Sequence, residues 1–256
     1  MRIAALDVDG SLLFEDRIAP ETVAAIRDWR AAGHLAVAAT GRSTAAFELA
    51  QRSGPVEVDF GILATGAVVV DAAGRVLHRR TLSRATVRGV LEQVRDMPEV
   101  TAYGSAVGRA DGRFFSTRAD GRGHALLREV RELGSDAAEA EDFVNMPVWI
   151  PDDAERRRVA DWVEATFEDA VVQVNEHFAD ILPAGSTKGD ALGWLVTHLG
   201  VPREEIELIT FGDSWNDLSM HAVADRSFSF PWSPEPVRAA THEVVASVAE
   251  ALPRLI

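Results

Sequence analysis

The first eleven residues constrain the fold more than any other stretch of the chain. Apolar residues 3–6 lead directly into Asp7 and Asp9, the pattern of a buried strand that ends at a reactive edge. Since side chains at i and i+2 share a face of an extended chain, both carboxylates can point into one pocket, and Gly10 allows a sharp turn behind them. Two like charges this close require a metal ion, a shared proton or both. A turn that simply favours Asp and Gly is the alternative.

The charge and composition of the chain limit which partners it can bind and indicate its cellular compartment. The 256 residues carry a formal net charge of −14, which argues against nucleic acid and anionic membranes as partners, because both are bound through basic surface. The chain has no cysteine, so disulfides and thiolate metal sites are excluded. No apolar run approaches the length of a membrane span, and the first residues read as a core strand. We therefore expect a cytoplasmic protein.

Strands and helices alternate at both ends of the sequence. After the opening strand, Pro20 begins a predicted helix that Gly33 ends, and Ser43 opens another helix after a buried strand over 35–39. Connections of this kind are right-handed and join parallel strands, so they predict a doubly wound, Rossmann-like parallel sheet. The other predicted elements of this α/β part are strands over 60–64, 67–70, 75–79, 206–211 and 227–230 and helices over 188–199 and near 236–240 and 247–252.

The middle third of the chain has a different order of elements. Its mixture of helix and strand patterns predicts an antiparallel sheet with helices on one side. The predicted helices cover 83–96, 124–133 and 152–167. Single strands cover 100–106 and 144–150, and a pair of strands covers 171–182. The acidic stretch 135–142 reads as a solvated loop. We therefore expect one core domain built from 1–82 and 182–256, interrupted by an inserted α+β domain at 83–181.

Further polar residues stand where the core elements end or begin. Thr40 and Asp213 follow predicted strands, Lys188 begins a helix, and Asp217 lies just beyond Asp213. Taken singly, each has an ordinary explanation as a cap, a surface lysine or a loop charge. Together with the first carboxylate pair they fit one chemistry: oxygen ligands for Mg²⁺, a carboxylate that attacks phosphorus, and a second that donates a proton. The hydroxyl and the ammonium group would hold phosphoryl oxygens.

Four motifs, in order and spacing, resemble the signature of the haloacid dehalogenase-like hydrolases. The motifs are Asp7-Val8-Asp9-Gly10-Ser11, Thr40-Gly41-Arg42, Lys188 and Gly212-Asp213-Ser214-Trp215-Asn216-Asp217. The resemblance covers nearly the whole chain. The insertion between the second and third motifs is similar to the α/β (C2-type) cap domain of the branch that includes the Cof-like sugar phosphatases, where the cap selects the substrate.

The resemblance implies a role for each motif residue. Asp7 would be the nucleophile, and Asp9 would be the general acid/base, whose backbone carbonyl also meets Mg²⁺. The metal ligands would be Asp7, Asp9, Asp213 and Asp217, the last directly or through water. The residues that bind or orient phosphate would be Thr40, Gly41, Lys188 and Asn216.

The sequence departs from this family's pattern in three places. Ser11 stands where the family usually has Thr, and it keeps the hydroxyl. Thr65-Gly66 replaces a common Asn-Gly pair. After the last long core strand, Phe230-Pro231-Trp232-Ser233-Pro234 replaces the usual Met-Gly-Asn-Ala stretch. This last change lies near the site entrance in the family, so it argues against assigning a Cof-like substrate.

The expected function is that of a Mg²⁺-dependent phosphomonoesterase, a monomer or homodimer that acts on a small, sugar-like phosphate through an aspartyl-phosphate intermediate. A phosphomutase of the same superfamily is one alternative. A receiver-type signalling module and a phosphate-binding protein with a decayed site are non-enzymatic alternatives, which the insertion and the complete set of charged motif residues disfavour.

The inserted domain contains a stretch rich in arginine, in a protein short of positive charge. Its four arginines are Arg109, Arg113, Arg118 and Arg122. A solvated, glycine-rich loop is the simpler interpretation. The functional hypothesis is that one or two of these guanidinium groups bind a second anionic group of the substrate.

Overall fold

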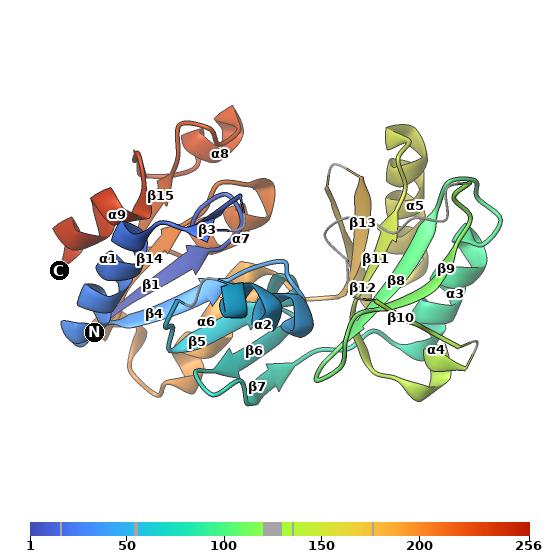
Figure 1. The fold of residues 1–256 in the computed structure, drawn as a ribbon, viewed down its shortest axis with the longest axis horizontal. Helices are drawn as coiled ribbons and strands as arrows, with labels where there is room; N and C mark the ends of the chain where they lie inside the picture. Colours follow the sequence, from blue (N-terminus) through green and yellow to red (C-terminus); the bar gives the residue numbers. More distant parts are fainter. Residues whose placement is uncertain (16, 54–55, 120–129, 135, 176) are drawn as a thin grey trace. The chain divides into compact units, whose positions relative to one another are not determined.

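The computed structural model describes residues 1–15, 17–53, 56–119, 130–134, 136–175 and 177–256, which fold into two compact units (Figure 1). Unit 1 comprises Met1–Gly41, Glu48–His78 and Thr187–Ile256, and unit 2 comprises Arg42–Phe47 and Arg79–Ser186. The range 83–181, proposed from the sequence as an inserted domain, lies within unit 2. Unit 2 also contains Arg42–Phe47 and residues 79–82 and 182–186, which the sequence placed in the core.

Unit 1 is built on an eight-stranded sheet with the order β16-β15-β14-β1-β4-β5-β6-β7. Its strands are β1 (Arg2–Asp7), β4 (Leu35–Ala39), β5 (Phe60–Leu63), β6 (Val68–Asp71), β7 (Val76–Arg79), β14 (Glu207–Phe211), β15 (Arg226–Ser229) and β16 (Glu243–Val244). Neighbours from β16 to β5 pair in parallel, and β6 pairs with β5 in antiparallel. This confirms the doubly wound, Rossmann-like sheet predicted from the sequence.

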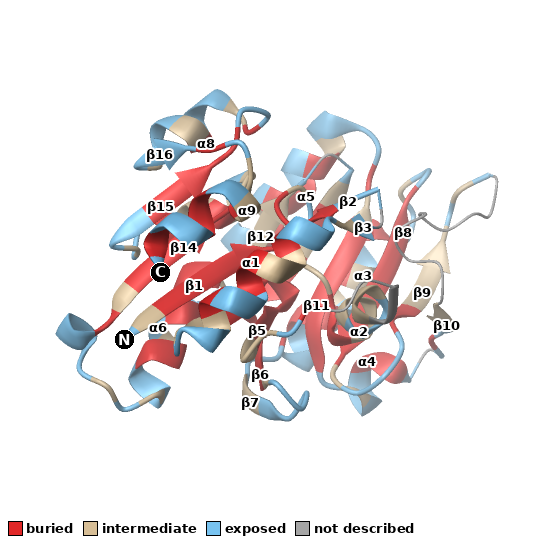
Figure 2. Cartoon of the chain, turned by 60° about the vertical axis from the view of Figure 1, so that its left-hand side comes forward, coloured by how far each residue is buried: buried red, intermediate tan, exposed pale blue. Residues whose placement is uncertain are grey.

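The central strand β1 contributes side chains to two separate apolar cores. Ala4 and Leu6 point to one cluster, with Trp29 of α1, and Ile3 and Ala5 point to the other. Helices therefore cover both faces of the sheet, as buried parallel strands require. Figure 2 shows β1 and β14 buried over almost their whole length. The helices of unit 1 are α1 (Pro20–Ala31), α6 (Lys188–His198), α7 (Leu218–His221), α8 (Glu235–Ala239) and α9 (Val248–Ala251), and α2 (Thr44–Ser53) spans the boundary of the units.

Several short elements complete unit 1. The strands β2 (Leu13–Phe14) and β3 (Arg17–Ile18) form an antiparallel pair directly after the first motif, which the sequence did not predict. Among the residues that the structure describes, 3₁₀ segments cover Ala64–Gly66, Arg203–Glu205, Trp215–Asp217 and Leu252–Leu255. None of the helices described in this structure has the length and apolar character needed to cross a bilayer.

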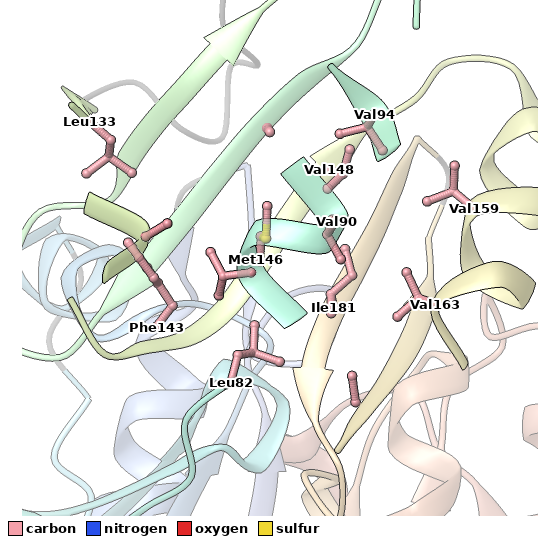
Figure 3. Close-up of a cluster of buried hydrophobic side chains, with 14 of the residues drawn as sticks. Leu82, Val90, Val94, Leu133, Phe143, Met146, Val148, Val159, Val163 and Ile181 are labelled. Carbon is pink, nitrogen blue, oxygen red and sulfur yellow. The ribbon is translucent and has the colours of Figure 1, made fainter. Parts of the chain in front are cut away.

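Unit 2 contains a six-stranded sheet with the order β10-β9-β8-β11-β13-β12, antiparallel except between β9 and β10. Its apolar core includes Val90 of α3, Phe143 and Met146 of β11 and Val163 of α5 (Figure 3). The strands are β8 (Thr101–Ala106), β9 (Gly112–Ser116), β10 (Arg131–Glu132), β11 (Phe143–Trp149), β12 (Ala170–Val174) and β13 (Phe178–Pro183). The helices are α3 (Arg84–Val94), α4 (Ala137–Ala140) and α5 (Asp153–Thr166), so the α+β class is confirmed.

Two sequence predictions in unit 2 are wrong in their described parts. The end of the helix expected over 124–133 is strand β10, because the N–H groups of Arg131 and Leu133 donate to the carbonyls of Asp111 and Arg113. The rest of that prediction, 124–129, lies outside the described residues. The stretch 135–142, expected to be a loop, contains the short helix α4. In both cases contacts or turns that periodicity does not reveal decide the local structure.

Candidate active site

The ends of three neighbouring strands bring the first and last motifs together. In the register of the sheet, Leu6 of β1 lies beside Phe211 of β14, and Asp7 lies beside Ala39 of β4. The residues that follow β4 and β14 are therefore Thr40 and the pair Gly212-Asp213, at the same edge as Asp7. In open parallel sheets this carboxyl edge is where ligands bind.

Lys188 is held at the centre of this edge. It begins α6, whose first turn is capped by the Thr187 hydroxyl accepting from the N–H of Asp190. Its Nζ donates to Oδ1 of Asp7 at 2.7 Å and to Oδ1 of Asp217 at 2.6 Å, and its side chain is 0% exposed. A solvated surface lysine is therefore excluded. Charge-assisted bonds of this length fix the ammonium group between the two carboxylates.

Asp217 is fixed by a second set of bonds within its own loop. Its Oδ2 accepts from the N–H of Ser214 at 3.0 Å, and the Ser214 hydroxyl accepts from the N–H of Asp217, so the two form a capping box. A Cβ added at Gly212 would lie 2.6 Å from Oδ2 of Asp217. Only glycine at this position leaves room for the buried carboxylate.

Gly10 allows the turn after Asp9 to approach Asp213. Its φ is +82°, and an added Cβ would lie 2.8 Å from the carboxyl carbon of Asp213. The turn is tight, because the N–H groups of Leu12 and Leu13 both donate to the carbonyl of Val8, at 3.0 and 2.8 Å. A side chain here would be strained by the backbone and would also displace the carboxylate.

Three carboxylates form a cluster with the donor chemistry of a divalent cation site. Oxygens of Asp7, Asp213 and Asp217 lie within 4.8 Å of one another, and Oδ2 of Asp7 is buried without a hydrogen-bond partner among the described residues. A buried, unpartnered carboxylate oxygen in an all-oxygen donor set fits Mg²⁺. The Asp9 carboxylate is exposed and does not belong to this cluster within the described part of the chain.

The excess of negative charge perturbs the acids of the cluster. Burial and then the charge of Asp217 hold the pKa of Asp7 well above its usual range, and the same two causes raise the pKa of Asp213 to about 6. Burial disfavours the ammonium form of Lys188, but the two carboxylates outweigh it, so its pKa is raised. One cation among three carboxylates leaves the site short of positive charge.

The proposed phosphate-binding residues of the second and fourth motifs also lie close together. Thr40 is fully buried, and its N–H donates to the carbonyl of Ile62 at 2.8 Å. A Cβ added at Gly41 would lie 3.4 Å from Oγ1 of Thr65 and 3.8 Å from Nδ2 of Asn216. The side-chain oxygen Oδ1 of Asn216 is buried without a partner among the described residues. This polar group is therefore available to a ligand.

Three residues near the edge were not assigned a role from the sequence. Thr65 is buried at a φ of +55°, and Gly66 touches the chain at Thr187, just before Lys188. Trp232 donates from its indole Nε1 to the carbonyl of Gly10 at 2.9 Å. The sequence did contain a sign that Thr65 and Trp232 could matter, since both lie in stretches that depart from the family pattern.

The described arginines of the inserted stretch have partners within unit 2. Arg109 lies 3.4 Å from Glu141, and Arg113 donates from Nε to Glu132 at 3.0 Å. The guanidinium of Arg118 lies over the ring of Trp149, 5.3 Å from its centre. These contacts support the interpretation of a solvated surface for Arg109 and Arg113. Arg122 lies outside the described residues.

Comparisons with known proteins agree with this geometry. The sequence profile of the haloacid dehalogenase-like hydrolases matches residues 4–251. The chain is 27% identical over 235 residues to the HMP-PP phosphatase of Klebsiella pneumoniae (strain 342), covering 89% of this chain and 83% of that protein. A haloacid dehalogenase-like hydrolase from B. subtilis superposes with a TM-score of 0.84 at 22% identity, covering 100% of both chains. The HAD subclass IIB sugar phosphatase BT4131 superposes with a TM-score of 0.77 at 19% identity, covering 100% of this chain and 99% of that one.

Proposed function

The chain belongs to the haloacid dehalogenase-like hydrolases and is a phosphatase of that family, and from this premise we propose that it hydrolyses a small phosphate monoester in two steps at Asp7. The observation that carries the proposal is the buried cluster in which Lys188 bridges Asp7 and Asp217 while Oδ2 of Asp7 has no partner among the described residues. A nucleophilic carboxylate needs a fixed position, and the bond from Lys188 to Oδ1 gives Asp7 one.

In the first step, an oxygen of Asp7 bonds to phosphorus and the bond from phosphorus to the leaving oxygen breaks. Asp9, which is exposed and two residues further along the chain, gives its proton to that oxygen. In the second step, water attacks the phosphorus of the aspartyl phosphate, Asp9 takes a proton from this water, and the Asp7 carboxylate leaves. Exposure suits Asp9 to this role, because it can exchange protons with solvent between the steps.

The metal ligands that we propose are Asp7, Asp213, Asp217 and the backbone carbonyl of Asp9. Bound Mg²⁺ would supply positive charge that favours ionised Asp7 and offsets the charge of the phosphoryl group. The carboxylates would hold the ion, and Lys188 keeps Asp7 and Asp217 at a fixed spacing. The raised pKa values of Asp7 and Asp213 support a site that requires a cation for full ionisation.

Phosphate binding is assigned to the polar groups of the second and fourth motifs. Thr40, Gly41 and Asn216 would donate to phosphoryl oxygens together with the ammonium group of Lys188. The proximity of Gly41 to Asn216 supports this assignment. A glycine next to Thr40 lets the phosphoryl group approach the backbone closely.

For the substrate, we propose a small phosphorylated metabolite, sugar-like in size, with unit 2 as the cap domain that selects it. The names of the compared proteins, HMP-PP phosphatase and sugar phosphatase, support small phosphorylated substrates of more than one kind. We propose a cytoplasmic monomer or homodimer without a nucleic-acid or membrane partner, in keeping with the net charge of −14.

The test is phosphate release from p-nitrophenyl phosphate, a panel of sugar phosphates and HMP-PP, with and without Mg²⁺. We compare the wild type with Asp7→Asn and with the control Asp28→Asn, whose carboxylate pairs with Arg27 on the exposed side of α1. We expect metal-dependent release that Asp7→Asn loses and Asp28→Asn keeps. Retention of the phosphoryl group on a sugar would instead identify a phosphomutase. Release that survives Asp7→Asn would refute the assignment of the nucleophile.

A further inference from the structure

Trp232 forms a hydrogen bond to the first motif although its indole N–H is not buried away from water. Its side chain is 47% exposed, yet its indole Nε1 donates to the carbonyl of Gly10 at 2.9 Å. An indole N–H this exposed could be satisfied by water, so the bond is not a consequence of burial. It joins two segments that are 222 residues apart in the chain.

The segment that carries Trp232 is fixed from several sides. The N–H of Ser233 donates to the carbonyl of Phe230 at 3.0 Å, and the Ser233 hydroxyl accepts from the N–H of Phe230 at 3.1 Å. Arg238 donates to the carbonyls of Pro231 and Ser233, both at 2.9 Å. The two prolines of this stretch further limit its backbone. Trp232 therefore extends from a rigid turn.

Beside its bond to Gly10, the indole ring packs against two aromatic rings, one in its own segment and one in the strand that follows the first motif. Its ring stacks on the fully buried Phe230, with the centroids 4.9 Å apart, and the ring of Phe14 meets it edge-on at 5.4 Å. Phe14 belongs to β2, directly after the turn, and Gly10 lies within the turn. Trp232 thus holds both the turn and the strand that leaves it.

Gly10 is the residue of the turn that most needs an external support. It has no side chain to anchor it, its φ is +82°, and a Cβ added there would lie 2.8 Å from the carboxyl carbon of Asp213. Glycine has more backbone freedom than any other residue, so a bond to its carbonyl restricts the turn effectively. Movement of Gly10 would alter the spacing between Asp9 and Asp213.

We propose that Trp232 is a positioning residue for phosphoryl transfer: its indole N–H holds the Gly10 carbonyl so that Asp9 and Asp213 keep the spacing that the reaction requires. The inference rests on the proposed function and extends it to a residue that no family motif contains. It also explains why the exposed Trp232 stands in a stretch that departs from the family pattern.

The test compares Trp232→Phe with Trp194→Phe. Phenylalanine at 232 keeps a ring against Phe230 and Phe14 but removes the N–H donor. Trp194 is a tryptophan of the same unit whose ring stacks on His78 and His198, each with centroids 4.7 Å apart. Trp232→Phe should lower kcat for p-nitrophenyl phosphate about tenfold, the loss expected for one hydrogen bond to a positioned group. Its KM should change less than about twofold, because Trp232 does not contribute to binding of the substrate in its ground state.

Hydrogen exchange of the turn supplies the second readout and does not depend on activity. Trp232→Phe should speed exchange at Gly10, Leu12 and Leu13, whose N–H groups close the turn, with Tm changed by less than about 3 °C. Trp194→Phe should leave both kcat and this exchange as in the wild type. Faster exchange with unchanged kcat would make Trp232 merely structural, and a lower kcat with unchanged exchange would refute action through the turn. If the wild type releases no phosphate, the proposed function fails, and with it the catalytic role of Trp232, while the exchange still decides whether Trp232 holds the turn.

Discussion

In unit 1 one ammonium group, that of Lys188, lies among three carboxylates, whereas in unit 2 the Glu141 carboxylate lies between the guanidinium groups of Arg131 and Arg109. The side chains of Lys188 and Asp217 are 0% exposed, while those of Arg131 and Arg109 are 31% and 58% exposed. One cluster is buried with excess negative charge, and the other is partly exposed with excess positive charge. Below, these are called the unit 1 cluster and the unit 2 cluster.

The pKa values of the acids shift in opposite directions in the two clusters. Burial and Asp217 raise the pKa of Asp7, whereas the bonds from Arg131 lower the pKa of Glu141. The unit 2 cluster therefore stabilises the ionised acid and contributes to folding. The unit 1 cluster opposes ionisation, which a protein tolerates where a bound cation or a reaction requires it. Uncompensated buried charge, and not the number of ion pairs, therefore marks the functional edge of unit 1.

Replacing a basic side chain in each cluster should give the largest difference in stability and activity between the two clusters. Lys188→Met leaves the buried carboxylates of the unit 1 cluster without their ammonium partner, so we expect a loss of about 3–5 kcal/mol in the free energy of unfolding at pH 8. We expect kcat to fall at least about a hundredfold, because phosphoryl oxygens lose a donor. Arg131→Met should cost about 1 kcal/mol and leave kcat unchanged. Urea denaturation and phosphate release measure both effects, and equal losses in the two variants would refute the contrast.

A pair of glycine substitutions tests how tightly the unit 1 cluster is packed. Gly10 and Gly108 have similar φ values, +82° and +73°, but an added Cβ meets Asp213 at Gly10 and nothing within 4 Å at Gly108. Gly108→Ala should cost about 1 kcal/mol through backbone strain alone, with full activity. Gly10→Ala should cost about 1–3 kcal/mol more and reduce kcat, because the carboxylate is displaced. Equal stability and activity of the two variants would show that Asp213 moves freely.

The metal-free protein should lose stability as the pH rises through the range in which the unit 1 cluster ionises. Between the ordinary pKa of 3.8 and the raised pKa of about 6, Asp213 holds a proton in the folded state that the unfolded chain has released. The free energy of unfolding therefore falls with rising pH in this window. Since Mg²⁺ competes with this proton, it should raise Tm more at pH 8 than at pH 5. Thermal unfolding followed by circular dichroism measures this, and an equal Mg²⁺ effect at both pH values, or one that Asp213→Asn keeps, would contradict it.

The smallest effect is expected in the unit 2 cluster. Glu141→Gln removes an acid whose pKa is lowered mainly by its bonds from Arg131. Its stabilising effect is present above the ordinary pKa of 4.5 and is lost as the pH falls through the lower folded value. We expect a loss of about 1 kcal/mol at pH 7 that becomes smaller as the pH falls below 4.5, with kcat unchanged. A loss that stays constant as the pH falls below 4.5, or a changed kcat, would mean that Glu141 has another role.

The sequence was sufficient to predict the sheet of unit 1, except its edge strand β16, and the residues at its carboxyl edge. Buried strands such as β1 and β4 are continuous apolar runs, and the chain places Asp7 and Thr40 directly after them. A parallel sheet brings such ends together whatever the loops do, so the proximity of Asp7 and Asp213 follows from topology alone. These predictions depend on the local pattern of apolar residues and on the rule that connections between parallel strands are right-handed.

Other features depend on contacts between distant residues and could not be predicted. The pattern around Lys188 does not reveal that its ammonium group bridges Asp7 and Asp217. The bond from Trp232 to Gly10 joins the two ends of the chain, and β10 exists because its backbone pairs with β9. Each of these features is set by tertiary contacts, which local sequence patterns do not reveal.

The most direct test of the central claim is to trap the intermediate on Asp7. A reaction with p-nitrophenyl phosphate and Mg²⁺ is quenched, treated with borohydride and digested, and the peptide that contains residue 7 is examined by mass spectrometry. Borohydride reduces an aspartyl phosphate to homoserine, so we predict homoserine at position 7 only when substrate and Mg²⁺ are both present. Turnover that leaves Asp7 unmodified, with homoserine at another aspartate, would contradict the assignment of the unit 1 cluster as the site of phosphoryl transfer.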